Sequence, residues 1–425
     1  MKPRKGLKKL SNAARVSALA KTGLRVLKPV ASIKNARLLL AVFITALFVF
    51  SFQEFRYKNS GSLLGISTKK EATQSANVNT NDDPEGKLDL KEILESTNQD
   101  VRLKAARRLV EKVDVEKALE ILEHSTLPHT GEGHLVLHQI GFYAYQKYGT
   151  DSILKCKDYF LYACYHGAII EAASDQGFDA IHKMTDKCKE SPVRHFQCVH
   201  AAGHAILALW NYDLPEALKT CDEIYEKDTQ FPEALSSCHN GAFMENLFGV
   251  HDWGKDKTQK RDWLSEDPYF PCNAFEEKYQ RGCWLNQAAR IYQMNNGDIA
   301  KTSELCRSAP KEEYVAWCMD NLARQIHPLT NGDPTKAFSL CQQEGPDWYN
   351  NCIIVNAGSF YSVGGRAQAV YICQNIPSEL KNECFGRVIG QIASDPITKK
   401  DKEAICQTIE FPFKTQCFSA IESST

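Results

Sequence analysis

The sequence lacks the short motifs that identify the common cofactor sites and catalytic nucleophiles. It has no Cys-x-x-Cys-His haem site and no Gly-x-Ser-x-Gly elbow, and no phosphate loop or dinucleotide fingerprint follows a predicted strand. A His-Glu-x-x-His zinc protease motif is also absent, because Ala201 stands after His200 where that motif needs glutamate. These absences argue against the enzyme classes that a local signature reveals.

Two residue types are missing from the N-terminal part of the chain. No cysteine precedes Cys156, and residues 1–37 contain eleven Lys/Arg but no Asp/Glu. The remainder has 40 basic and 52 acidic residues, a net charge of −12. Because phosphate binding needs positive charge on the folded part, this asymmetry argues against nucleic acid as a partner.

One uncharged hydrophobic run follows the basic head. It covers residues 38–53 if Gln53 is included, which is near the lower limit for crossing the hydrocarbon core. A cleaved signal peptide is the alternative, but the basic region is long and no small-x-small cleavage site follows Phe52. We expect an uncleaved transmembrane signal-anchor, with residues 1–37 as a cytoplasmic tail and the rest exported.

The cysteine distribution supports export independently. All 16 cysteines follow the hydrophobic run, and an even number of thiols is typical of an oxidising compartment. No asparagine after the run lies in an Asn-x-Ser/Thr acceptor, which favours a periplasmic or outer-face location over a lumenal one. A mitochondrial presequence is a further alternative that we rank lower.

Residues 54–87 are polar and predict a flexible stalk. Residues 88–130 predict helices that lead into a repeat domain at 131–425. Within 100–125 the apolar residues follow helical spacing, and Asp100 and Asp114 stand at N-cap positions.

The cysteines mark a tandem repeat. The first members of successive pairs recur at steps of 32, 33, 51, 34, 35, 32 and 33 residues, a period typical of helical hairpins. In each unit an amphipathic run starts at the second cysteine (helix A), then comes a turn, then a shorter run that ends at the next cysteine (helix B). The predicted disulfide pairs are Cys156/Cys164, Cys188/Cys198, Cys221/Cys238, Cys272/Cys283, Cys306/Cys318, Cys341/Cys352, Cys373/Cys384 and Cys406/Cys417.

Pairing within these short loops requires a break in the helix. Eleven residues of continuous helix would hold the two Cα atoms roughly 16 Å apart at 1.5 Å per residue, whereas a disulfide needs about 4.4–6.8 Å. Most of the loops contain a proline that supplies the break, namely Pro192, Pro232, Pro310, Pro346, Pro377 and Pro412. The sequence therefore predicts an all-α solenoid of hairpins with a period of about 33 residues, stapled by local disulfides and preceded by one transmembrane helix.

One unit carries an insertion. Between Cys238 and Cys272 lie 33 residues, and the segment 250–271 is charged and contains two tryptophans. We favour a surface insertion; a lid or contact loop is the alternative.

The layout resembles the Sel1-like and tetratricopeptide repeat families, and is closest to secreted cysteine-rich Sel1-like repeats. The resemblance covers residues 131–425 and rests on the period, the stapled turns and the Ala-x-x-x-Cys endings at Ala217–Cys221, Ala337–Cys341 and Ala369–Cys373. The glycine-rich Sel1 consensus is not reproduced. The resemblance implies a protein-binding scaffold.

Histidines are concentrated in the first four helices A. Position +2 after the second cysteine holds His166 and then His200. The helix before them carries His134 and His138, which we align with the equally spaced pair His200 and His204. Because residues four apart share a helix face, each pair can present two imidazoles together.

The next helix has His239 at +1, and Glu171 and Glu245 both stand at +7. Side chains from adjacent helices can meet at one ion, and a His/Glu set suits Zn, Cu or Fe. Gly167 and Gly241, which have no side chain, would allow the helices to approach closely, as would Gly203. The candidate metal ligands are therefore His134, His138, His166, Glu171, His200, His204, His239 and Glu245.

Two functions remain open on this evidence. One is a metal-binding module, or a metal-dependent enzyme, that uses these residues. The other is a non-catalytic scaffold that binds a peptide or partner protein on a concave face lined by helices A, in which case the histidines are hydrogen-bonded groove or core residues.

Overall fold

The computed structural model describes residues 86–128, 131–249, 262–395 and 397–423, all of which belong to one compact unit. Within these ranges every regular element is helical, which confirms the predicted all-α class. No helix in them is long and apolar enough to cross a membrane. The predicted tail, signal-anchor and nearly all of the stalk lie outside the described residues.

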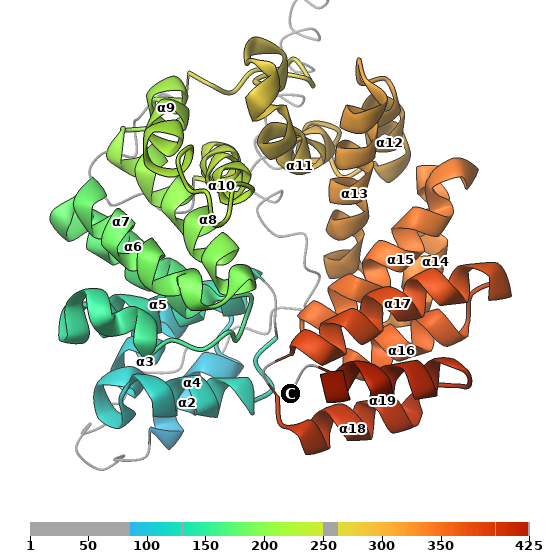
Figure 1. Ribbon diagram of the computed structural model, residues 1–425, viewed down its shortest axis with the longest axis horizontal. Helices are drawn as coiled ribbons and strands as arrows, with labels where there is room; N and C mark the ends of the chain where they lie inside the picture. The colour runs from blue at the N-terminus through green and yellow to red at the C-terminus, as the bar shows by residue number, and fades with distance from the viewer. Residues whose placement is uncertain (1–85, 129–130, 250–261, 396, 424–425) are drawn as a thin grey trace, which may run out of the picture. The chain divides into compact units, whose positions relative to one another are not determined.

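The helices form hairpins that follow one another along the chain (Figure 1). Three helices lead in: α2 (Lys87–Glu95), α3 (Gln99–Val113) and α4 (Val115–Glu123). The helices A are α5 (Gly131–Tyr148), α6 (Ala163–Gln176), α8 (Pro192–Leu209), α10 (Ala234–Phe248), α11 (Glu277–Met294), α13 (Glu312–Leu329), α15 (Pro346–Ser362), α17 (Ser378–Ser394) and α19 (Phe413–Ser423). Each of them packs against the next one in this series.

Shorter helices B connect them. They are α7 (Phe178–Lys187), α9 (Leu214–Tyr225), α12 (Ile299–Arg307), α14 (Pro334–Cys341), α16 (Arg366–Gln374) and α18 (Lys399–Thr408). The 3-10 helix η2 (Gly149–Leu154) takes the place of helix B after α5. The predicted helical-repeat architecture is confirmed.

Eight disulfides join the predicted cysteine pairs, so this part of the prediction is confirmed in full. The bonds are Cys156–Cys164, Cys188–Cys198, Cys221–Cys238, Cys272–Cys283, Cys306–Cys318, Cys341–Cys352, Cys373–Cys384 and Cys406–Cys417. Their Cα–Cα distances run from 5.5 Å to 6.5 Å. In the chain-entropy account, loops of this size contribute roughly 3 kcal/mol each.

The start of helix A differs from the prediction, which placed it at the second cysteine of each pair. Pro192 begins α8 six residues before Cys198, and Pro346 begins α15 six residues before Cys352. Proline suits the first helical turn because its missing N–H has no intrahelical partner there. Ser191 caps α8 by accepting from the backbone N–H of Arg194. The prolines therefore end the loop by starting helix A ahead of the cysteine.

The same correction applies to the helices A of the C-terminal half. The predicted start at the second cysteine is wrong there too, because each helix begins four to six residues earlier and contains the cysteine within its first two turns. These cysteines are Cys283 in α11, Cys318 in α13, Cys384 in α17 and Cys417 in α19. In α11, α13 and α17 the first turn carries glutamate, which the partial positive charge of a helix N-terminus favours. The amphipathic pattern did not show this turn, because a polar first turn contributes no apolar residues to it.

The turns between helices A and B follow from their Asn, Gly and Asp residues. Asn296 and Gly297 have φ of 54° and 82°, values in the left-handed region that these residue types tolerate best. Asp298 then caps α12 by accepting from the backbone N–H of Lys301. Asp333 caps α14 in the same way by accepting from the N–H of Thr335.

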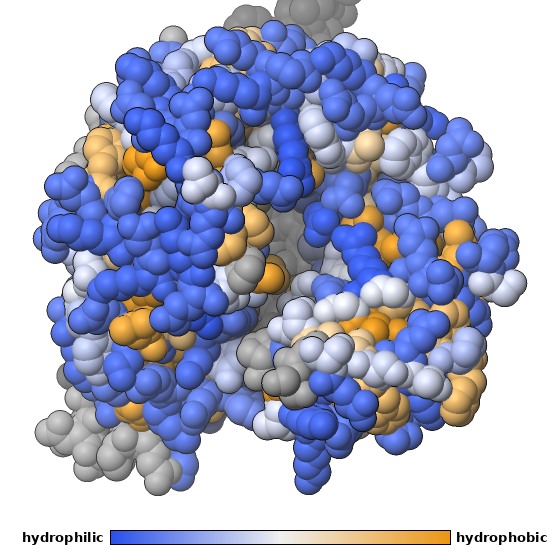
Figure 2. Space-filling model, in the orientation of Figure 1, coloured by the Kyte–Doolittle hydropathy of each residue, from blue (hydrophilic) through white to orange (hydrophobic). Residues whose placement is uncertain are grey.

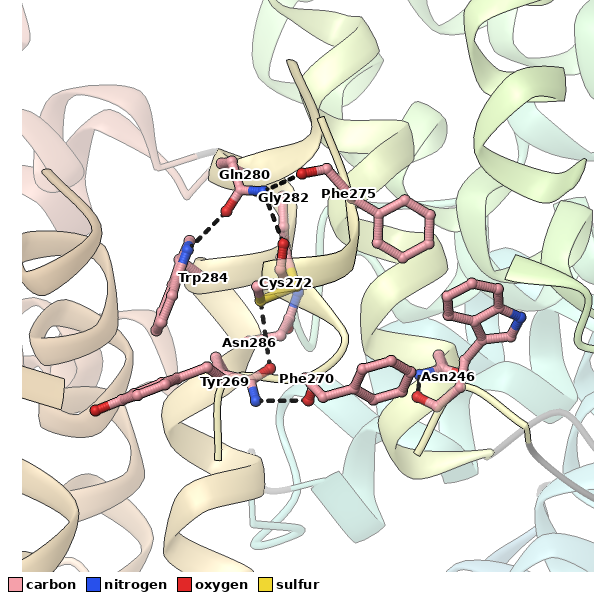
Figure 3. Close-up of a disulfide and its surroundings, with 12 residues drawn as sticks. Asn246, Tyr269, Phe270, Cys272, Phe275, Gln280, Gly282, Trp284 and Asn286 are labelled. Atoms are coloured by element: carbon pink, nitrogen blue, oxygen red, sulfur yellow. Dashed lines mark hydrogen bonds between the residues drawn. A yellow bond between two sulfur atoms is a disulfide. The ribbon is translucent and has the colours of Figure 1, made fainter. Parts of the chain in front are cut away.

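The described end of the insertion is an irregular segment held against α11 by buried glutamines (Figure 3). Gln280 Nε2 donates to the carbonyl oxygens of Cys272 and Phe275, at 2.8 Å and 2.7 Å. Its Oε1 accepts from the indole of Trp284 at 2.9 Å. Gln287 donates to the carbonyl of Phe270 at 3.0 Å. These amides supply donors to the carbonyls of Phe270 and Phe275, and a second donor to the carbonyl of Cys272, which also accepts from the N–H of Phe275.

The face drawn in Figure 2 is mainly hydrophilic, with apolar residues in small scattered patches. The apolar side chains are instead buried in a continuous cluster that runs through the repeats, in which each of the eight disulfides takes part. This distribution is expected for a thin array whose units bury surface mainly against their neighbours.

One carboxyl group in the described C-terminal half is buried without a hydrogen-bond partner. Glu344, in η5 (Gln342–Glu344), is 0 % exposed, and neither carboxyl oxygen has a hydrogen-bond partner among the described residues. Burial, assisted by the negative charge of Asp320, raises the pKa of Glu344 to about 8. The unfolded chain releases this proton near the ordinary value of 4.5.

Stability should therefore depend on pH through Glu344. Between about pH 4.5 and 8 the folded protein holds a proton that the unfolded chain has lost, so the free energy of unfolding falls as pH rises through this window. We expect Glu344→Gln to unfold at a higher temperature than the wild type at pH 8 and at a similar temperature at pH 4, measured by calorimetry. Glu304→Gln, at an exposed position on α12, is the control and should leave the slope unchanged. A wild-type slope retained by Glu344→Gln would contradict this assignment.

Candidate metal centre

Five histidine side chains from α5, α6 and α8 converge into a group that we call the histidine cluster. His134 and His138 lie on α5, His166 on α6, and His200 and His204 on α8. The ring centroids are 4.6 Å apart for the α5 pair and 4.8 Å apart for the α8 pair. His166 lies between the pairs, 5.0 Å from the ring of His134 and 5.6 Å from that of His200.

The α5 end of the cluster has a defined proton arrangement. His134 Nδ1 is 2.7 Å from the carbonyl oxygen of Phe160, and a carbonyl only accepts, so Nδ1 of the ring donates there. In neutral His134 the Nε2 atom then carries a lone pair, and it lies 3.1 Å from His166 Nδ1. His166 Nε2 is buried with no hydrogen-bond partner in the described part of the chain.

The chain bends sharply to place the Phe160 carbonyl. Phe160, Leu161 and Tyr162 have φ of 48°, 55° and 62°, three consecutive side-chain-bearing residues in the left-handed region. Each such residue costs on the order of 1–3 kcal/mol and persists only where its surroundings enforce it. The Cys156–Cys164 disulfide closes the loop that contains all three.

The α8 end of the cluster is oriented by a carboxylate. Glu245 of α10 is 0 % exposed, and its Oε2 lies 3.0 Å from His204 Nδ1. Its Oε1 accepts from the Tyr212 hydroxyl at 2.7 Å. His204 Nε2 faces His200 Nε2 across 3.1 Å. Glu245 therefore lies behind His204 as an orienting group, whereas the sequence had placed it among the ligands.

Burial keeps the interior of the cluster uncharged. The pKa of His166 is held well below its usual value, chiefly by burial and then by the charges that His134, His200, His138 and His204 would carry. The pKa of His200 is also held well below its usual value, first by burial and then by His204. Neutral imidazoles with available lone pairs are the form in which histidine binds metals.

Glycines allow the helices to cross closely enough for these rings to meet. A Cβ on Gly167 would lie 2.2 Å from the carbonyl oxygen of His138, and a Cβ on Gly241 would lie 2.0 Å from that of His200. A Cβ on Gly203 would lie 2.1 Å from the carbonyl oxygen of Cys238. The predicted close approach at these glycines is thus present, and any larger residue would push the backbones apart.

The same contacts show that α5 is displaced by one turn from the alignment made on the sequence. Gly167 meets His138 as Gly241 meets His200, so the structural equivalent of His200 is His138 and not His134. The missing cysteine in α5 left the sequence without a marker for this register.

The displacement separates Glu171 from the cluster's hydrogen bonds. Phe142, four residues after His138, occupies the turn of α5 that corresponds to His204 in α8, so Glu171 meets no imidazole there among the described residues. Glu171 instead accepts from the side-chain amide of Gln146 at 2.6 Å.

His239 also makes its hydrogen bond elsewhere. Its Nε2 lies 2.9 Å from Asp222 Oδ1, and the other oxygen of Asp222 accepts from Lys278 and from the Tyr279 hydroxyl, both at 2.6 Å. Position +1 is one residue, or about 100°, around the helix from position +2, where the equivalent side chain is Asn240. The structure thus places His239 in a separate polar network between α9, α10 and α11.

Three of the histidines meet the geometric condition for holding one ion. One nitrogen from each of His134, His138 and His166 lies within 4.8 Å of the others. His200 and His204 approach each other at 3.1 Å but form no such group of three in the described residues.

A polar pocket of ≈300 Å³ opens beside His200 between α8, α10 and α11. Its lining includes the polar residues Gln197, His200, Glu233, Ser236, Ser237, Asn240 and Arg281, and the apolar residues Phe196 and Leu285. Sequence reasoning did not identify Arg281, Tyr212, Asp222 or Phe160. Asn240 carried a signal, because it stands at the +2 position that holds histidine in two earlier repeats.

No protein-family model matches the chain, and no curated protein matches it. Among solved structures, the chain is similar to the crystal structure of an engineered protein at 14% identity, covering 80% of this chain and 98% of that one. The TM-score of that comparison is 0.20.

The close crossing of α8 and α10 predicts that one added methyl group lowers the stability of the fold. Gly241→Ala should lower the free energy of unfolding by about 1–3 kcal/mol or more, because the added Cβ overlaps a backbone carbonyl. Gly386→Ala, on the exposed face of α17, is the matched control, since no described atom lies within 4 Å of a Cβ there. The control should gain up to about 1 kcal/mol, as alanine usually does over glycine in a helix. Equal denaturant midpoints for the two variants would contradict the crossing geometry.

Proposed function

We propose that this protein binds a transition-metal ion through His134, His138 and His166. The observation that carries the proposal is the convergence of three histidine nitrogens within 4.8 Å, on two helices that glycines bring into backbone contact. A tetrahedral zinc ion with Zn–N distances of about 2.0–2.1 Å needs nitrogens about 3.4 Å apart. His134 Nε2 and His166 Nδ1, at 3.1 Å, are already close to that spacing.

The surroundings of the three rings support metal binding over a simple polar core. Metal-ligating histidines usually donate their second N–H to a backbone carbonyl or carboxylate, which fixes the tautomer. His134 does so to the Phe160 carbonyl, from a loop whose left-handed residues are costly to maintain. An all-imidazole set suits Zn, Cu or Fe.

Three protein ligands would leave a fourth position for water or substrate, which is the arrangement of catalytic zinc sites. A metal-dependent reaction is therefore an extension of the proposal.

The alternative is a peptide- or protein-binding scaffold of the Sel1-like or tetratricopeptide type. The unbroken series of helices A, each packed on the next, supports it. A chain that folds with its disulfides intact but retains no metal would favour this alternative.

Metal analysis of the purified full-length chain tests the metal-binding proposal. After dialysis against trace zinc, His134→Ala/His138→Ala should contain one equivalent less metal than the wild type, by mass spectrometry of the elements. His182→Ala is the control, because His182 is an exposed residue of α7 paired with Asp186 outside the cluster. It should keep the wild-type content. Equal metal in the double variant and the wild type would overturn the proposal.

We further propose that the basic head and the hydrophobic run at 38–53 anchor the protein in a membrane with the repeat domain on the outer side. The eight disulfides support this, because such bonds persist in oxidising compartments. The full chain should resist extraction from membranes by alkaline carbonate, and deletion of 38–53 should release it. Carbonate-soluble full-length protein would contradict the anchor.

A further inference from the structure

We infer that His200 and His204 form a second metal position, open to the pocket beside α8, where a small carboxylate ligand completes the coordination and pairs with Arg281. This inference rests on the proposed function, since it extends the same histidine cluster. It assigns a separate ion to the α8 end and a chemical class to the ligand.

The first observation is the pairing of the two Nε2 atoms. They lie 3.1 Å apart, close to the separation of two nitrogens on one zinc ion. Glu245, which is wholly buried, accepts a hydrogen bond from His204 Nδ1–H, so that Nε2 of the neutral His204 ring carries the lone pair. The carboxylate–histidine arrangement is the usual support of a metal ligand.

The second observation concerns the other hydrogen-bond partners of His200. The imidazole also makes hydrogen bonds with the backbone of Ser237 and the side chain of Asn240, two residues of the pocket lining. In the tautomer of His200 that is protonated at Nδ1, the Nε2 lone pair faces that of His204, and a cation between the two atoms is bound by both.

The α5 and α8 ends of the cluster provide two independent sets of donors. The nitrogen pair of His134 and His166 is one, and that of His200 and His204 is the other, each at 3.1 Å. Each pair has its own orienting acceptor, the Phe160 carbonyl in one case and Glu245 in the other. Among the described residues only His134, His138 and His166 bring three ligand atoms within 4.8 Å of one another, so the α8 pair lies outside that group.

The pocket gives a further ligand access to the unfilled coordination sites of the second metal position. Two protein ligands leave at least two coordination sites of a tetrahedral ion unfilled, and His200 forms part of the pocket wall. The pocket volume of ≈300 Å³ is at the lower end for small-ligand sites.

The charges in the pocket select the ligand. Arg281 is exposed in it and makes no ion pair or side-chain hydrogen bond with the described residues. Its guanidinium matches the planar fork of a carboxylate. Glu233, also in the lining, disfavours a dianion such as phosphate and would accept from an amino group. A small monocarboxylate, such as an amino acid, therefore fits best.

Cobalt titration of the full-length apo protein tests the second position. The visible absorption of Co²⁺ should report two equivalents in the wild type and one in each of His134→Ala/His138→Ala and His200→Ala/His204→Ala. If the second double variant loses helical circular dichroism, His200→Gln, which keeps size and polarity, replaces it. A single equivalent in the wild type, or two in the α8 variant, would overturn the second position and leave the proposed function standing. No bound cobalt in the wild type would overturn both.

Acetate is the probe for the ligand class. Added to the cobalt-loaded protein, it should shift the visible spectrum with saturation, and Arg281→Gln should weaken its apparent affinity about tenfold while leaving the metal count at two. Lys301→Gln, an exposed lysine of α12 outside the pocket, should bind acetate as the wild type does. No spectral shift, or equal affinity in Arg281→Gln and the wild type, would overturn the assignment of the pocket to a carboxylate.

Discussion

Six of the eight disulfides tie the end of helix B in one hairpin to helix A of the next, and the rest of the array depends on that link. Of the other two, Cys156–Cys164 follows η2 and Cys272–Cys283 follows the insertion. A stack of helix pairs buries surface mainly between neighbours, so no single deep core holds distant repeats together. These six bridges span the breaks between helices B and A, and they hold Cα atoms 5.5–6.5 Å apart across them. Each helix A packs on the next one in chain order.

In the first repeats, some neighbouring helices A cross with their backbones in close contact. The helices α5 and α6, and likewise α8 and α10, cross at glycines, where a Cβ would lie only 2.0–2.2 Å from a carbonyl oxygen. At the next crossing, of α10 with α11, a Cβ on Gly282 would lie 2.9 Å from the backbone nitrogen of Asn240. Close backbones leave room for large polar rings beside the crossing. Five imidazoles and a fully buried glutamate occupy it, although burying such groups is costly unless they are paired or bind an ion.

Some of the site could be found on the sequence, because its residue types recur at fixed distances from the cysteines. His166 and His200 share the +2 position, and Gly167, Gly203 and Gly241 mark the crossings. Glu171 and Glu245 share +7 as well, yet only Glu245 meets a histidine. The difference comes from α5, which has no cysteine to indicate its register and is shifted by one turn.

The sequence by itself determined the helical class, the repeat length and the eight disulfide pairs, because these depend on local spacing and on residues that break helices. Only the tertiary structure decided which histidines face each other, that Glu245 orients His204, and that Arg281 shares a pocket with His200. Those relations depend on how far one helix slides along the next. A slide of one turn preserves the apolar face of a helix while exchanging its polar partners, so hydrophobic periodicity carries no information about it.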